Sequence, residues 1–174
     1  MHAFLMENVR HIVALGILLG RIGDVTTTYL SSPKLKLESN PLVRKLRWPL
    51  AAATLLLCLI PYLDLRVGIM LMVVFFLVCL SNSLRLWLVR SIGEDEYFQL
   101  LLSAAGKANY RVSLILNFIP GVFMSLLALA LLVFYPDSTE NGYWFAHGIL
   151  AYAIITMIYF PRNFIRLRKI ALSQ

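Results

Sequence analysis

Charged side chains are scarce in this chain of 174 residues. Lys, Arg, Asp and Glu make up 14% of it, and 60% is hydrophobic. Soluble domains average roughly 25% charged and 45–50% apolar residues, so this deficit excludes a water-soluble fold. The amino end, MHAFLMENVRHIV, lacks a basic segment followed by an apolar run and a small-residue cleavage site. We therefore expect the first hydrophobic segment to stay in the mature protein.

Cysteine is also rare, and familiar catalytic motifs are missing. Cys58 and Cys79 lie inside apolar runs without CxxC spacing or a neighbouring His, which indicates buried thiols with no metal or redox role. There is no GxSxG, HExxH or repeated Asp motif. His11 and His147 fall at the ends of apolar segments with no accompanying acid, so we expect no zinc site there.

Five apolar segments dominate what the chain does contain. A transmembrane helix needs about 17–25 residues, and a tight antiparallel turn at Asp64–Arg66 separates the second segment from the third. No internal repeat or linker is visible. The sequence predicts an all-α fold, a polytopic membrane helix bundle forming one domain over 1–174, with spans of roughly 12–30, 48–63, 67–89, 112–135 and 143–160.

Two further helices are predicted to be short and to lie along the cytoplasmic interface. Asn40 can cap the first, with Pro41 at the first helical position, and it should run toward Trp48. The acidic run 94–96 suits the start of the second, which should end near Gly106. Their apolar faces should lie against lipid or protein.

The net charge of +7 follows from basic residues that flank the spans, and no basic patch typical of a nucleic-acid interface stands apart from them. We therefore expect no nucleic-acid partner. By the positive-inside rule the amino end is outside and the carboxyl end is cytoplasmic, in the cell (inner) membrane. Arg10 and Arg66 are on the outer side, and the cytoplasmic side carries Lys34, Lys36, Arg44, Lys45, Arg47, Arg85, Arg90, Lys107, Arg111, Arg162, Arg166, Arg168 and Lys169.

The opening span has two notable faces. Gly16, Gly20 and Gly23 form a strip of small residues, which allows close helix contact and predicts either packing within the bundle or a homo-oligomer through this face. Beside it, Arg21 and Asp24 lie at i, i+3 and can pair. Two roles are open for this acid: a structural ion pair, or contact with an ion, a lipid headgroup or a substrate.

Other polar groups converge on the same layer of the bilayer. Asn82 and Asn117 either form hydrogen bonds between helices or belong to a functional site. In the last span Tyr152, Thr156 and Tyr159 share one helical face, which suits packing and interfacial anchoring. The candidate polar site comprises Arg21, Asp24, Thr27, Thr28, Glu38, Asn40, Asn82, Arg85 and Asn117.

Glu38 is the most informative loop residue. If the segment 31–40 folds back under the bundle, Glu38 and Asp24 supply two carboxylates suited to a divalent cation such as Mg²⁺. The alternative is a solvated charge that pairs with Lys34 or Lys36.

The run Gly23-Asp24-Val25-Thr26-Thr27-Thr28 with Glu38-Ser39-Asn40-Pro41-Leu42 resembles the D-x-x-T-T … E-x-N-P-L signature of a family of small bacterial and archaeal multi-span membrane proteins of unknown function. The match covers about the first quarter of the chain. The resemblance implies a special role for the positions Asp24, Thr28, Glu38, Asn40 and Pro41, and it implies no reaction.

Three functions fit this sequence. The first is a binding or packing protein with a polar site in the cytoplasmic half of the bilayer, built around Asp24, with membrane lipid as a partner. The second is a membrane-embedded, Mg²⁺-dependent enzyme acting on a lipid or lipid-linked phosphate, with Arg21, Arg85 or Arg162 neutralising the phosphate. The third is a small-cation carrier or channel subunit. A binding protein or an enzyme predicts a cavity beside Asp24, whereas a protein in which the polar groups only pack predicts none. A carrier or channel predicts a continuous polar path to the outer face.

Overall fold

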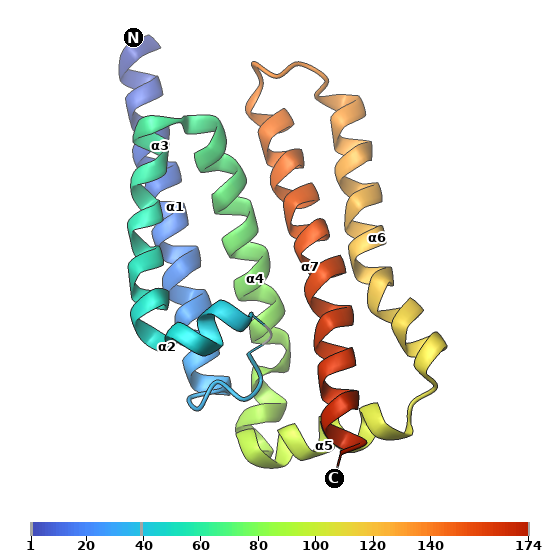
Figure 1. The fold of residues 1–174 in the computed structure, drawn as a ribbon. Helices are drawn as coiled ribbons and strands as arrows, with labels where there is room; N and C mark the ends of the chain where they lie inside the picture. Colours follow the sequence, from blue (N-terminus) through green and yellow to red (C-terminus); the bar gives the residue numbers. More distant parts are fainter. Residues whose placement is uncertain (1, 39, 174) are drawn as a thin grey trace.

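The computed structural model describes residues 2–38 and 40–173. In these ranges all regular secondary structure is helical (Figure 1). The elements are α1 (His2–Ser31), α2 (Pro41–Ala53), the 3₁₀ helix η1 (Thr54–Leu59), α3 (Ile60–Leu63), α4 (Leu65–Ile92), α5 (Glu94–Lys107), α6 (Tyr110–Phe134) and α7 (Asn141–Ala171).

Within the described residues, five helices are long and apolar enough to cross a membrane, as the sequence predicts. They extend over Asn8–Ser31, Leu42–Leu63, Leu65–Ile92, Tyr110–Phe134 and Asn141–Ala171. The second is continuous through α2, η1 and α3, which follow one another without a gap. This is a helical, multi-pass membrane bundle.

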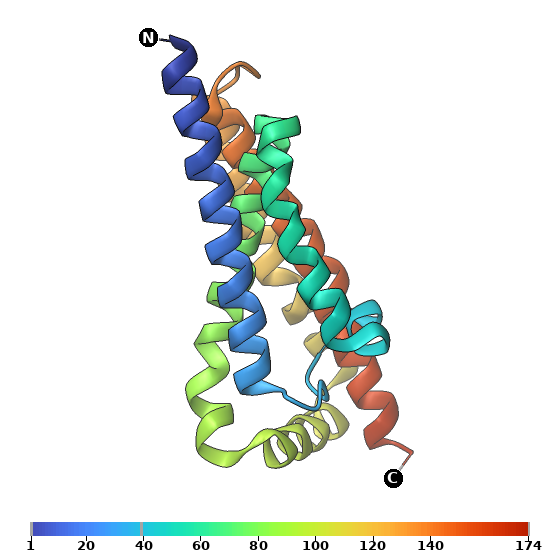
Figure 2. The same ribbon diagram turned by 90° about the vertical axis from the view of Figure 1, so that its left-hand side faces the viewer.

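The long helices lie side by side in a simple order. α4 packs between α1 and α7, and α6 covers the far side of α7 (Figure 1). The segment α2–η1–α3 packs against α1, while α5 crosses the end of the bundle opposite the amino terminus (Figure 2). α4 therefore has a long helix on each of two sides, and α7 does as well.

The glycine strip of α1 is a packing face against α4. A Cβ added at Gly16 would lie 2.5 Å from Met72 Sδ, and one at Gly23 would lie 2.7 Å from Cys79 Sγ. The prediction of close helix contact is thus confirmed, and the partner is α4 of the same chain. Self-association stays a prediction, and a second copy would have to bind a different face.

The predicted interfacial helices and the tight turn are present. Asn40 caps α2 by accepting a hydrogen bond from the Leu42 N–H at 2.9 Å. Arg47, with φ 56° and ψ −149°, kinks α2 near the start of the second apolar segment. α5 begins with three acids in its first turn. Asp64 caps α4 by accepting from the Arg66 N–H at 2.8 Å, so α3 and α4 run antiparallel.

Candidate functional site

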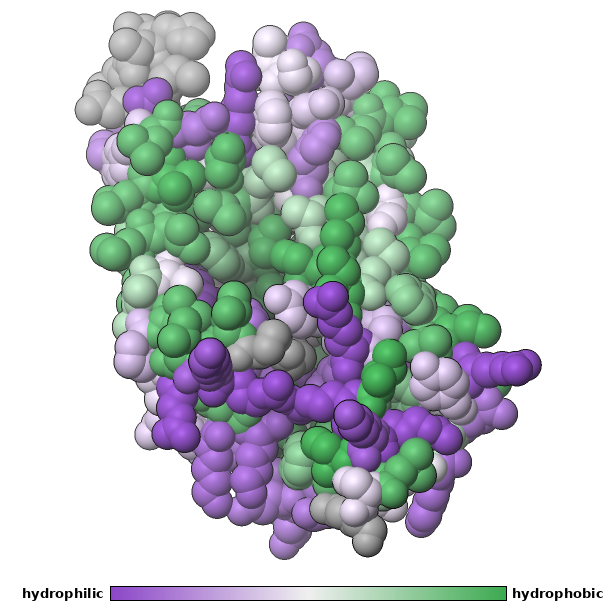
Figure 3. All heavy atoms as spheres, viewed as in Figure 1, coloured by the Kyte–Doolittle hydropathy of each residue, from purple (hydrophilic) through white to green (hydrophobic). Residues whose placement is uncertain are grey.

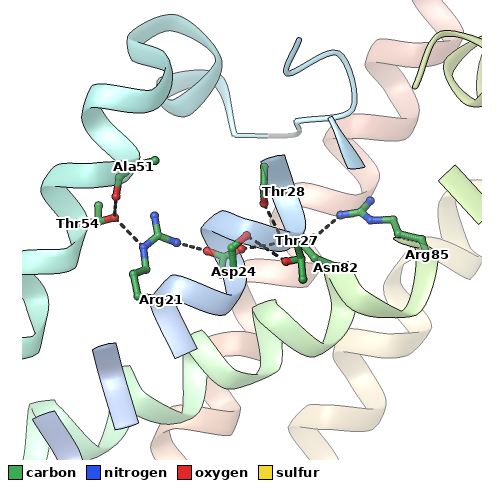
Figure 4. A network of polar contacts seen from close by, with 8 residues as sticks. All are labelled: Arg21, Asp24, Thr27, Thr28, Ala51, Thr54, Asn82 and Arg85. Atoms are coloured by element: carbon green, nitrogen blue, oxygen red, sulfur yellow. Dashed lines mark hydrogen bonds and ion pairs between the residues drawn. The ribbon is translucent and has the colours of Figure 1, made fainter. Parts of the chain in front are cut away.

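A hydrogen-bonded network at the middle of α1 links it to η1 (Figure 4). Arg21 Nη1 donates to Asp24 Oδ2 in an ion pair, and Arg21 Nε donates to Thr54 Oγ1 at 2.7 Å. The guanidinium also lies over the Phe75 ring, 5.2 Å from its centroid. The pairing of Arg21 with Asp24 is confirmed, and it neutralises two charges that would otherwise be costly at this depth.

The same network continues from Asp24 to α4. Asn82 Nδ2 donates to Asp24 Oδ1 at 2.8 Å and lies 3.2 Å from Thr28 Oγ1, while Asn82 Oδ1 accepts from Arg85 Nη2 at 2.6 Å. Asp24 is only 6% exposed. Because both of its oxygens accept hydrogen bonds from side chains, the carboxylate is held in one position between two helices.

The network borders a cavity of about 360 Å³. Its walls come from α1, α2, α4 and α7, and the loop of residues 32–38, together with Asn40, closes it toward α5. Polar and apolar side chains both face it. The lining comprises Arg21, Asp24, Val25, Thr28, Ser31, Ser32, Leu37, Glu38, Asn40, Val43, Trp48, Ala51, Val74, Phe75, Val78, Ser81, Asn82, Arg85, Tyr152, Ile155, Thr156, Tyr159 and Phe160.

The wall formed by α4 changes from apolar to polar along its length. Its cavity residues toward the middle of the bundle are Val74, Phe75 and Val78, and those toward α5 are Ser81, Asn82 and Arg85. At a rise of about 1.5 Å per residue, this change takes place over roughly 16 Å. This wall of the cavity is thus apolar toward the middle of the bundle and polar toward α5.

Glu94, at the start of α5, anchors the segment that closes the cavity. Its carboxylate accepts from the Ser32 hydroxyl at 2.5 Å and from the backbone N–H groups of Lys34 at 3.0 Å and Lys36 at 2.9 Å. The sequence suggested only a helix-start role for this acid. These hydrogen bonds explain why the loop keeps a single conformation despite the unusual positive φ of 57° at Leu35.

Asp95 neutralises the two lysines of this segment. Lys34 Nζ lies 2.9 Å and Lys36 Nζ 2.5 Å from its carboxylate oxygens. Hydrogen bonds from Lys36 and then Lys34 lower the pKa of Asp95 from 3.8 to about 2. The ammonium groups therefore pair with Asp95, and the alternative in which Glu38 pairs with them is wrong.

Arg166 of α7 holds the same segment from the other side. Its Nη1 donates to the Glu38 carbonyl oxygen at 2.9 Å and its Nη2 to that of Lys36 at 3.2 Å. From its place in the sequence, this arginine is only one of the basic residues on the cytoplasmic side. No sequence signal marks it, because its partners are main-chain atoms 128 and 130 positions away.

Glu38 and Asn40 reach the cavity, as the folded-back loop requires. Glu38 Oε1 accepts from the Asn40 N–H at 2.6 Å. Both residues line the cavity together with Asp24. Asp24 and Glu38 are the acidic members of this lining, and the described part of the chain has no cluster of three or more His, Cys, Asp or Glu suited to a metal. A divalent cation here would need oxygen atoms from a ligand as well.

Two predicted members of the polar site lie outside the cavity. Thr27 Oγ1 donates to the Asp24 carbonyl oxygen at 3.0 Å and turns away from the lining. Asn117 donates to the Ser113 carbonyl oxygen of its own helix at 2.7 Å. Placing Asn117 in the site was wrong, because α7 stands between α6 and α4. On α7, by contrast, the predicted face of Tyr152, Thr156 and Tyr159 does line the cavity.

The chain matches no protein-family model, no curated protein and no solved structure. The resemblance to the D-x-x-T-T … E-x-N-P-L proteins therefore stays a prediction. Any functional conclusion has to rest on the geometry described above.

Proposed function

We propose that this protein binds the polar head of a membrane lipid in the cavity beside Asp24, within the cytoplasmic half of the bilayer. The observation that carries the proposal is that a buried, fully hydrogen-bonded Asp24 nevertheless borders an open volume of about 360 Å³. An ion pair that only locked helices together would be stabilised by close packing around it. A cavity at that point would lower the stability of the protein.

The dimensions and lining of the cavity support an amphipathic ligand. Its volume falls in the range of about 300–1,000 Å³ that is usual for small-molecule sites. On the α4 wall, the apolar stretch at Val74 and Val78 suits the start of an acyl chain, and the polar stretch at Ser81 and Arg85 suits a headgroup. A lipid lying parallel to the helices would place its acyl chain along the apolar stretch and its head along the polar stretch.

The charge distribution supports the orientation. Hydrophilic side chains gather around α5 and the carboxyl end of α7, and hydrophobic ones form a band across the middle (Figure 3). The positive-inside rule then assigns this end to the cytoplasm and the amino end to the outside of the cell (inner) membrane. The lipid would come from the cytoplasmic leaflet.

Transport of a small cation receives less support from the structure. On the outer side of Arg21, Val13, Ile17 and Ile69 pack into a buried apolar cluster, and Ile17 has no exposed surface. A cation moving outward along α1 would lose its hydration at this layer.

Enzymatic action on a lipid phosphate is the second candidate, because Glu38 and Asp24 face one cavity with Arg85. Mg²⁺ in proteins is commonly held by one or two carboxylates plus phosphate oxygens of the substrate. In that case Mg²⁺-dependent release of phosphate from a lipid monophosphate should be measurable and should be lost in Glu38→Gln. Absence of Mg²⁺-dependent turnover in the wild-type protein would eliminate this candidate.

Filling the cavity tests the lipid-binding proposal. Val78→Phe places a ring in the cavity, whereas Val133→Phe adds the same ring at a position on α6 that is 78% exposed. Native mass spectrometry of the detergent-solubilised protein should show lipid adducts weakened about tenfold, or ~1.4 kcal/mol, by the first change. The second should leave them unchanged. Equal lipid binding by both variants and the wild type would refute the proposal.

A further inference from the structure

The cavity has two charged side chains that no ion pair neutralises. Of its four charged residues, Arg21 and Asp24 pair with each other. Arg85 donates to the neutral amide of Asn82, and the Glu38 carboxylate accepts from a backbone N–H. Neither takes part in an ion pair within the described ranges 2–38 and 40–173. The cavity therefore has one unpaired positive and one unpaired negative group.

The surroundings of Glu38 keep its charge unpaired. Lys34 and Lys36 are the basic residues nearest to it in sequence, and both are held by Asp95. Arg166 is close to the same segment, but its guanidinium donates to the carbonyl oxygens of Lys36 and Glu38 and not to the carboxylate. The fold thus fixes the backbone around this acid while its side chain faces the cavity.

Both groups border the same cavity, Arg85 from α4 and Glu38 from the loop that follows α1. Arg85 is one helical turn beyond Asn82 toward α5, about 4.5 Å along the axis at 1.5 Å per residue. Glu38 belongs to the segment that closes the cavity below α1 and α4. A lipid with its chains toward Val74 would bring its head to the part of the cavity that Arg85 and Glu38 both border.

We propose that the ligand is a zwitterionic phospholipid, whose phosphate binds the Arg85 guanidinium and whose ammonium group binds the Glu38 carboxylate. This inference rests on the proposed lipid-binding function and names the headgroup class. Guanidinium and phosphate form strong charge-assisted hydrogen bonds. A primary ammonium group forms the same kind of bond with a carboxylate, whereas a quaternary ammonium group is attracted to it by charge alone. A purely anionic head would pair with Arg85 and leave Glu38 without a counter-ion, and a purely cationic one would leave Arg85 without a counter-ion.

Headgroup competition tests the inference on the wild-type protein. The full chain in detergent is mixed with phosphatidylethanolamine, phosphatidylcholine and phosphatidylglycerol that have the same acyl chains, and the adducts are measured by native mass spectrometry. Both zwitterionic lipids should bind about fivefold more tightly than phosphatidylglycerol, a factor equivalent to ~1 kcal/mol. Equal or tighter binding of phosphatidylglycerol would overturn the inference.

Charge variants identify the residues responsible. Glu38→Gln should remove the preference for zwitterionic heads, Glu38→Lys should invert it, and Arg85→Gln should weaken binding of all three lipids. Arg90→Gln and Glu96→Gln change exposed charges outside the cavity and serve as matched controls, so they should leave the order unchanged. A preference that persists in Glu38→Lys would also refute the assignment.

The outcomes separate this inference from the function on which it depends. If lipid binds without headgroup preference and Val78→Phe still weakens it, the lipid site stands and the zwitterion assignment fails. If Val78→Phe has no effect on any adduct, both fail.

Discussion

Neutralising Asp24 should destabilise this protein far more than neutralising an exposed acid. Asp24→Asn leaves Arg21 charged, and the Arg21 side chain is only 12% exposed. Removing one partner of a buried ion pair typically costs about 3–5 kcal/mol. The substituted amide oxygen can still accept from Arg21 Nη1, and Arg21 keeps its hydrogen bond to Thr54. We therefore expect the lower end of that range, about 3 kcal/mol in the free energy of unfolding.

Asp64→Asn is the matched control for this change. Asp64 is exposed and caps α4 through two backbone N–H groups, and asparagine caps helices about as well as aspartate. Its cost should be below about 0.5 kcal/mol, as for most surface substitutions.

The double variant Arg21→Met, Asp24→Asn separates charge from packing. Removing both charges leaves no uncompensated ion, so the double variant should be about 2 kcal/mol more stable than Asp24→Asn alone. Equilibrium unfolding in mixed detergent micelles, followed by circular dichroism, measures all four proteins. Equal tolerance of Asp24→Asn and Asp64→Asn, or a double variant no more stable than Asp24→Asn, would refute the reasoning.

Three further predictions follow from the packing and the loop. Gly148→Val should prevent α7 from approaching α4, because the new Cβ would lie 2.7 Å from the Cβ of Val73. Thermal unfolding should show that the variant loses at least about 2 kcal/mol of stability, whereas Gly106→Ala, the control, should be tolerated. Arg166→Met should free two carbonyl groups of the segment 31–40, which predicts faster amide hydrogen exchange in that segment but not in α6. The pKa of Asp95 is lower in the folded state than the ordinary 3.8, so its contribution to stability is complete above about pH 4 and disappears as the pH falls toward 2. Asp95→Asn should therefore lower the melting temperature at pH 6 and leave it unchanged at pH 2. A difference in melting temperature that persists at pH 2 would show that the effect does not come from the charge of Asp95.

Much of the candidate site was predictable, because its features are local in sequence. The pairing of Arg21 with Asp24 follows from i, i+3 spacing, and the cap at Asn40 follows from the Asn-Pro start of a helix. The prediction that Glu38 reaches the layer of Asp24 needed only a loop that turns back under the bundle.

The placement of Asn117 and the role of Glu94 were beyond sequence reasoning. Asn117 has the residue type and depth expected of a site member, but α6 lies on the far side of α7 from the cavity. Glu94 looked like an ordinary acid at the start of a helix. Its hydrogen bond to Ser32 spans 62 positions, and no periodicity in the chain reports such a contact.

The amino-acid sequence by itself determined the class of protein, the five apolar helices and the two short helices at one end. These follow from hydrophobic content and from capping, which act between residues a few positions apart. Only the tertiary structure decided that the glycine strip packs against α4, that Arg166 and Glu94 hold the segment 31–40, and that a cavity remains beside Asp24. The physical reason is that helices in a bilayer choose their neighbours by side-chain fit and interhelical hydrogen bonds, and both depend on which segments meet in space.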